Sequence, residues 1–289
     1  MDSITHTLFG LTLYGAVDKC DFSKEKKRAL LFTTVVGSQI PDIDVISKLW
    51  DTEGQYQMWH RGITHSIFMV PVWAIVLALF CYLFWKVKDR RIFLIGALSV
   101  FIHNTSDLFN AWGTGYFEPF SQARITFGTI PIVDFVIWAI ILGGFIIAKK
   151  TKLASFQVYR FVWAAILLHA TLQTGQGYII YQQHNDYYEQ QALSARFVPW
   201  NYTLIGKSGD TVEVVQVNLW SEPTVEEVLI SRKEADLDHL FERNPEAKTL
   251  YEWSPFVVIV EDEDIIGIYD PRFYRNGQSF LFEYIEKER

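Results

Sequence analysis

Three long apolar runs constrain the fold of this 289-residue chain more than any other feature of its sequence. They cover residues 67–85, 130–148 and 161–181, and the first of them contains no charged residue. A helix of about 20 apolar residues can cross the roughly 30 Å hydrocarbon core of a bilayer. Shorter or interrupted apolar runs lie at 4–17, 29–40 and 92–110. We therefore predict an all-α membrane bundle of about six helices in residues 1–181.

Basic residues are distributed unevenly over the connections between these runs. Segments 18–28, 86–91 and 149–160 hold 13 of the 16 Lys and Arg residues of the first 181 positions. With six crossings these segments share one side, which the positive-inside rule identifies as the cytoplasm. The N-terminus and the end of the last predicted helix then both face the extracytoplasmic side, and so does the C-terminal domain that follows. A soluble bundle whose apolar helices form the core is the alternative.

The sequence changes character after residue 181, where 21 acidic side chains stand against 10 basic ones. This balance argues against nucleic acid as a partner, because phosphate binding needs clustered Lys and Arg. We expect a linker at 182–195 and a soluble α+β domain at 196–289. Within that domain the patterns predict a hairpin at 201–205 and 211–219, a helix at 224–243, and strands at 256–260, 265–269 and 279–285.

Histidines and aspartates of the first 181 residues gather, on this topology, at the outer end of the bundle. His103 and Asp107 are four residues apart on one predicted helix, so their side chains share a face. Imidazole and carboxylate groups bind zinc and related divalent ions, and ionisable residues at membrane depth commonly mark a functional site. The candidate metal ligands are His6, Asp42, Asp44, His60, His65, His103, Asp107 and Asp134.

Two carboxylates near several imidazoles suit one or two divalent ions, which we expect to be zinc, with manganese or iron as alternatives. Such ions activate a bound water near neutral pH, and Asp42 or Asp44 could bridge two of them. Asp42, Asp44 and Arg61 are therefore the catalytic candidates, with Arg61 meeting a phosphate group. Other interpretations stay open: the two aspartates end helices, Arg61 pairs with a carboxylate, and Asp134 supports a histidine or caps a helix.

A metal transporter or sensor scaffold without chemistry is the second class of function. A transporter should carry polar residues through the whole depth of the membrane. Here His169, Thr171 and Gln173 lie deeper, whereas the other polar candidates gather at one end. This distribution favours an enzyme.

Several stretches resemble the YdjM-type membrane-bound metal-dependent hydrolase family. The similar stretches are Met1–His6 with the following Leu8–Gly10, Gly37–Asp44, His60–Ser66, His103–Asp107, Asn110–Thr114 and Pro119–Ser121. The resemblance is close over residues 1–150 and looser in the C-terminal domain. It implies a membrane location and a metal-dependent hydrolase activity.

The order of the candidate ligands is also similar to that of bacterial zinc-dependent phospholipase C enzymes, which cleave phosphoesters at an all-helical zinc cluster. This similarity implies a phosphoester substrate, and the membrane location favours a lipid. The chain has no His-x-x-x-Glu sequence, so one or two ions are expected and not three. Phe135 follows Asp134 where the YdjM-type pattern has proline. We expect hydrolysis by metal-activated water at the outer membrane face; the sequence does not indicate an oligomeric state.

Overall fold

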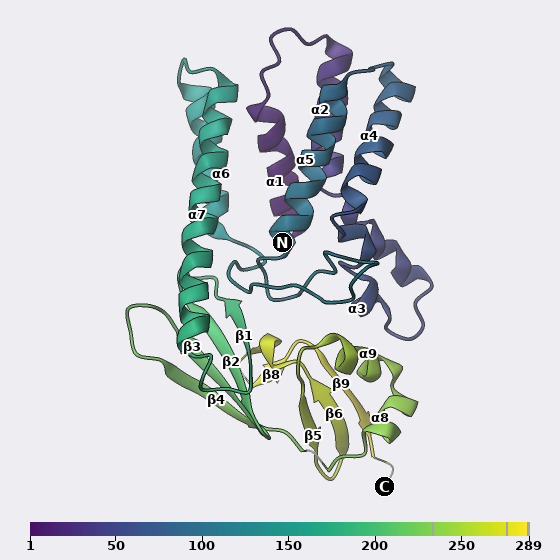
Figure 1. Cartoon of the computed structure of the whole chain (residues 1–289), viewed down its shortest axis with the longest axis vertical. Helices are drawn as coiled ribbons and strands as arrows, with labels where there is room; N and C mark the ends of the chain where they lie inside the picture. Colours follow the sequence, from purple (N-terminus) through teal and green to yellow (C-terminus); the bar gives the residue numbers. More distant parts are fainter. Residues whose placement is uncertain (233, 276, 288–289) are drawn as a thin grey trace. The chain divides into compact units, whose positions relative to one another are not determined.

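A computed structural model describes residues 1–232, 234–275 and 277–287 of the chain. The chain forms two compact units (Figure 1). Residues 1–44 and 61–175 form one, here called the bundle unit, and residues 45–60 and 176–289 form the other, the mixed unit. A short strand occurs inside the segment expected to be a linker. The expected domain boundaries stay a prediction.

Helices build the bundle unit, and aspartate side chains begin three of them. The carboxylates of Asp2, Asp89 and Asp134 accept hydrogen bonds from backbone N–H groups in the first turns of α1, α5 and α6, which satisfies donors that have no partner inside a helix. The elements of the unit are α1 (Ser3–Ala16), α2 (Lys24–Gly37), the start of η1 (Ile40–Leu49), η2 (Ile63–His65), α4 (Met69–Trp85), α5 (Arg90–Asp107), α6 (Phe135–Lys150) and α7 (Ser155–Gln183) up to Gly175.

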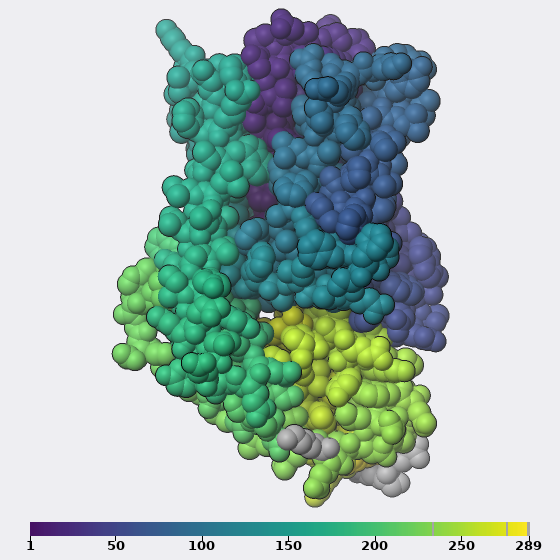
Figure 2. All heavy atoms as spheres, in the orientation of Figure 1, coloured from purple at the N-terminus to yellow at the C-terminus, as the bar shows by residue number. Residues whose placement is uncertain are grey.

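The three basic connections lie together at one end of the bundle unit (Figure 1). They join α1 to α2, α4 to α5, and α6 to α7. The start of α1, η2 and the end of α5 lie at the opposite end. Segment 108–134, blue-teal in Figure 2, runs across that end and is tied to it by bonds such as Gly115 N–H to the Arg61 carbonyl, 2.7 Å.

The expected six-helix membrane bundle is wrong for the described residues, among which no single helix combines the length and hydropathy needed to cross a bilayer. α4 has 17 residues and α6 has 16, or about 25 Å at 1.5 Å per residue. α6 begins at Phe135 and not at Ile130, because Asp134 caps it. α7 has 29 residues, but its polar residues lower its hydropathy. Two pairs of consecutive helices reach the required length and hydropathy when each pair is taken together, but each pair is bent at the break between its helices. They are 24–37 with 40–49, and 56–65 with 69–85.

Close helix packing sets the position of α1, which carries His6. A Cβ added to Gly10 would lie 2.6 Å from the backbone oxygen of Thr34, so only glycine allows α1 to approach α2 this closely. On another face of α1, Phe9 packs in an apolar cluster with Ile137 of α6 and Ile166 of α7. Burial of such side chains is the main force that holds helices together.

Two antiparallel sheets and two short helices form most of the mixed unit. The first sheet has the order β1-β2-β3-β4 and the second the order β5-β6-β9. The predicted hairpin is confirmed, since β2 pairs with β3 from Tyr202–Val217 to Ser208–Thr211. The elements are α3 (Tyr56–Trp59), β1 (Gln190–Ala195), β2 (Tyr202–Ser208), β3 (Thr211–Val217), β4 (Thr224–Ile230), α8 (Leu237–Arg243), α9 (Pro245–Trp253), β5 (Val258–Glu261), β6 (Ile265–Tyr269), η3 (Pro271–Phe273), β7 (Tyr274–Arg275), β8 (Gln278–Ser279) and β9 (Phe282–Glu286).

The predicted helix at 224–243 is wrong over its first half. Residues 224–230 form strand β4, which pairs with β3, and a helix begins only at Leu237. Val225, Val228 and Ile230 are β-branched, which favours a strand, and the edge of β3 supplies the hydrogen bonds that an isolated segment lacks.

Candidate metal centre

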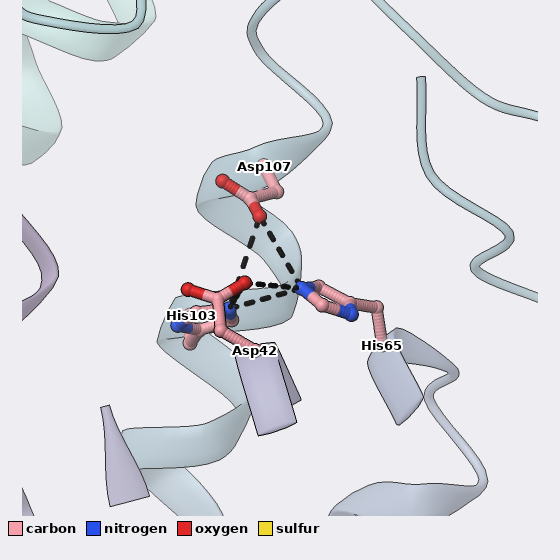
Figure 3. A group of neighbouring side chains, drawn as sticks. All are labelled: Asp42, His65, His103 and Asp107. Atoms are coloured by element: carbon pink, nitrogen blue, oxygen red, sulfur yellow. Dashed lines mark hydrogen bonds and ion pairs between the residues drawn. The ribbon is translucent and has the colours of Figure 1, made fainter. Parts of the chain in front are cut away.

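Four predicted ligands from three segments of the bundle unit converge on one point (Figure 3). Asp42 lies in η1, His65 in η2, and His103 and Asp107 one turn apart on α5. Each contributes one donor atom, and these four atoms all lie within 4.8 Å of one another. The imidazoles and the Asp107 carboxylate are buried, whereas the Asp42 side chain is 25% exposed. The cluster is therefore open on the Asp42 side.

The spacing of the donor atoms fits a tetrahedral ion. Nε2 of His65 lies 3.1 Å from Nε2 of His103, 3.2 Å from Oδ1 of Asp42 and 3.5 Å from Oδ2 of Asp107. Nε2 of His103 lies 3.7 Å from the Asp42 oxygen and 3.8 Å from the Asp107 oxygen. Ligands about 2.0–2.1 Å from a tetrahedral zinc ion are about 3.3 Å apart. The donor set and its spacing therefore fit one divalent cation.

Hydrogen bonds at the far side of each imidazole turn Nε2 toward the centre. Nδ1 of His103 lies 2.8 Å from the carbonyl oxygen of Ser38, so Nδ1 carries the proton and Nε2 is free to accept. Nδ1 of His65 lies 3.0 Å from Thr64 Oγ1 and 3.5 Å from Asp44 Oδ2. Such outer contacts fix the orientation of histidine ligands in metal sites.

Arg61 and the Met1 amino group contact the buried Asp107 carboxylate. Nε of Arg61 lies 3.2 Å from Oδ2, and the Met1 amino group donates to Oδ1. Burial alone would raise the pKa of Asp107, but the charges of Arg61 and of the Met1 amino group hold it well below its usual value. Asp107 is therefore ionised, as a metal ligand must be.

Arg61 contacts other residues of the site through both its side chain and its backbone. Its Nη1 donates to Asn110 Oδ1 at 2.7 Å, while its backbone N–H donates to Asp44 Oδ2 at 3.0 Å. Its φ of +58° is a left-handed conformation that costs a non-glycine residue about 1–2 kcal/mol. Such strain persists where the surrounding contacts enforce it, and it is concentrated at functional sites.

Burial keeps the imidazoles of His65 and His6 neutral. It lowers the pKa of His65 to about 4 and, with the neighbouring His103, that of His6 to about 3. Burial alone would raise the pKa of Asp42, but its contacts with His103 and His65 hold it below its usual value. Neutral imidazoles beside ionised carboxylates are the protonation states that metal binding requires.

The two depressed histidine pKa values predict that the metal-free protein loses stability in mild acid. Between about pH 4 and 6.5 the unfolded chain binds protons that folded His65 excludes, so the free energy of unfolding falls as the pH is lowered. The loss from pH 7 to pH 5 is about 2 kcal/mol for each of His65 and His6. Thermal unfolding in detergent with EDTA measures it. His65→Gln should show a shallower dependence, and a flat wild-type midpoint from pH 7 to 5 would contradict the prediction.

The structure places the other predicted ligands around the centre or away from it. His6 stacks on His103 with ring centroids 3.8 Å apart, and its Nε2 lies 3.3 Å from Asp107 Oδ1, outside the group of four. His60 belongs to the mixed unit, where its ring stacks on Tyr56. Asp134 caps α6 and lies 2.9 Å from Nε2 of His169, which matches the interpretation as a partner of a histidine. The ligand roles of these residues stay predictions.

Three groups at the centre were not anticipated from the sequence. They are the Met1 amino group, the Ser38 carbonyl and the Asn110 amide. Backbone groups leave no signal in side-chain patterns, so the first two could not have been found. Asn110 had a signal, because it is a polar residue three positions after Asp107 within a stretch similar to the YdjM-type pattern.

Residues 1–181 match the family model described as YdjM inner membrane protein. The chain belongs to the YdjM family. The resemblance inferred from the sequence is thus confirmed, and so is the association with a membrane, at the level of the family description. The side of the membrane on which the YdjM metal centre lies stays a prediction.

Among curated proteins, this YdjM family member is similar to "Uncharacterized protein YfhP" of Bacillus subtilis (strain 168). The two are 35% identical over 139 residues, which are 46% of this chain and 42% of YfhP. The matched region thus spans less than half of that relative. No solved structure matches the chain.

Proposed function

We propose that this YdjM family member is a membrane-associated, metal-dependent hydrolase. The observation that carries the proposal is the convergence of four donor atoms from Asp42, His65, His103 and Asp107 at separations that fit a tetrahedral cation. A structural zinc site is normally closed on all sides, whereas a catalytic site keeps one position open. Four protein donors fill a tetrahedral cation, so a bound water requires a fifth coordination position or the displacement of Asp42, whose side chain is the one partly exposed.

The chain's own residues prepare this centre for a cation. His65 and His103 present Nε2, each held by a contact at Nδ1. Asp107 supplies a negative charge that Arg61 and the Met1 amino group keep in place. A divalent ion held there supplies Lewis acidity and activates water for attack. Zinc suits the mixed imidazole and carboxylate donors, and manganese and iron are the alternatives.

The proposed substrate is a phosphoester, and a membrane lipid is the favoured source. The similarity in ligand order to zinc-dependent phospholipase C supports the first part, and the family's membrane location supports the second. The proposed site lies on the extracytoplasmic side, because the basic connections gather at the other end of the bundle unit. Arg61 bonds to Asp107 and Asn110, so a contact with substrate phosphate would require it to exchange partners.

The test combines metal analysis with hydrolysis assays on the full chain purified in detergent. We expect about one zinc, manganese or iron ion per chain by plasma mass spectrometry. We also expect EDTA-sensitive cleavage of bis-p-nitrophenyl phosphate or of phosphatidylglycerol in mixed vesicles. Bound metal without any cleavage would favour the sensor or transporter interpretation. A protein that stays metal-free after titration with all three ions would overturn the proposal.

A further inference from the structure

The chain leaves the bundle unit between two groups of residues of the metal centre and then returns to it. Asp44 is the last residue before the departure and Arg61 the first after the return. Residues 45–60, here called the strap, belong to the mixed unit. Two of the four ligands, Asp42 and His65, thus flank a segment that another unit holds.

Contacts within the mixed unit fix the tip of the strap on α9. Nε2 of Gln55 donates to Thr249 Oγ1 at 2.9 Å, and the same hydroxyl donates to the Glu53 carbonyl at 3.4 Å. Gly54 has a φ of +68°, and a Cβ there would lie 2.5 Å from Cγ of Glu246. The Asp51 carboxylate accepts the Tyr56 N–H at 2.6 Å, which shapes the turn into α3. Hydrogen bonds and close packing therefore hold the tip of the strap against α9.

Contacts within the bundle unit tie the two ends of the strap together at Asp44. Its Oδ2 accepts hydrogen bonds from Arg61 N–H and from Thr64 Oγ1, both at 3.0 Å. The same oxygen lies 3.5 Å from Nδ1 of His65, on the side of the ring opposite the candidate ligand atom. One carboxylate thus closes the strap and orients a metal ligand.

We propose that the strap couples the mixed unit to the metal centre, with Asp44 as a positioning residue for His65. The hold of α9 on the strap sets where Asp42 and His65 stand, so the mixed unit regulates metal affinity. This inference rests on the proposed function to the extent that the four residues hold a metal. The family match covers residues 1–181 and says nothing of the C-terminal region. The proposal gives that region a role.

Metal affinity is the property that such a coupling changes. Ligand spacing must match the ion within a few tenths of an ångström, and a carboxylate behind a histidine ligand typically changes metal affinity 10–100-fold. Asp42 is the ligand nearest the strap in sequence and the most exposed of the four. Of the four ligands, Asp42 is therefore the one whose position we expect the strap to influence most, whereas His103 and Asp107 lie on α5.

Zinc affinity of the full chain in detergent, measured by competition with a chromophoric chelator, tests the coupling. Asp44→Asn should weaken binding by about 10–100-fold at unchanged stoichiometry. Thr249→Val removes the hydroxyl that joins Gln55 to Glu53 and should weaken binding measurably. The matched control Thr224→Val, on exposed β4 of the same unit, should bind zinc as the wild type does.

The cobalt-substituted absorption spectrum distinguishes positioning from general damage to the fold. A shift of the ligand-field bands in Asp44→Asn and Thr249→Val, absent from Thr224→Val, supports the coupling. Loss of stoichiometric metal in Asp44→Asn would make Asp44 a ligand and overturn its positioning role. Wild-type affinity and spectrum in Thr249→Val would overturn the regulation by the mixed unit. A wild-type protein that binds no zinc would overturn the proposed function as well, so the failures are distinguishable.

Discussion

His103→Ala should reduce zinc affinity by about 100-fold or more. A four-ligand zinc site contributes about 10–16 kcal/mol of binding free energy, so one ligand accounts for about 3 kcal/mol, or roughly two orders of magnitude in Kd. The loss of zinc affinity on removing His103 should be at least this large, because its Nε2 faces three other donors and its Nδ1 is already held by Ser38. Chelator competition measures the change.

His169→Ala is the matched control for this experiment. His169 is also a buried histidine of the bundle unit, but it pairs with Asp134 and lies outside the group of four. Removing it should leave the metal stoichiometry of one ion unchanged, even if stability falls. Equal loss of metal in both variants would show that the effect comes from the fold and not from the ligand.

Arg61→Met should destabilise the metal-free protein by about 3–5 kcal/mol, because it leaves the buried Asp107 carboxylate without its guanidinium partner. In a chain of this size the thermal midpoint would fall by about 10 °C. The fall should be smaller with zinc present, because the cation compensates the same carboxylate. Thermal unfolding with EDTA and with zinc, on the same preparation, gives both values.

Arg91→Met controls for the loss of an arginine. Arg91 pairs with Asp89 at 3.2 Å, but its side chain is 55% exposed, and such pairs contribute about 0–1 kcal/mol. Its midpoint should move little and should not depend on zinc. A fall in the Arg61→Met midpoint, relative to the wild type, that is equally large in EDTA and in zinc would show that Arg61 and the cation do not compensate the same carboxylate.

The centre was predictable from the sequence where polarity and helical spacing coincide. His103 and Asp107 stand out because an apolar run tolerates an imidazole and a carboxylate four residues apart only if they do something together. His65 and Asp42 followed from their positions at the ends of neighbouring apolar runs. The charge of the connections also predicted which end of the bundle would hold the ligands, without using the ligands themselves.

The parts that failed depend on contacts that a local pattern does not contain. Asp134 shortened α6 by acting as a cap inside an apolar run. Val225 and Val228 entered a strand because the edge of β3 was there to pair with them. The strap lies within residues 1–181, which were predicted to form the bundle, yet Gln55 bonds to Thr249, 194 residues further along the chain. No periodicity within residues 45–60 points to such a partner.

The route of the strap also bears on how this protein can be divided. Cutting the chain after Gly175 looks like the removal of a C-terminal domain, but residues 45–60 would stay behind without the α9 surface on which they rest. In the fragment, the segment between Asp44 and Arg61 would lack the surface against which it packs. Because the two units alternate along the chain, point substitutions, and not deletions, are the appropriate way to dissect them.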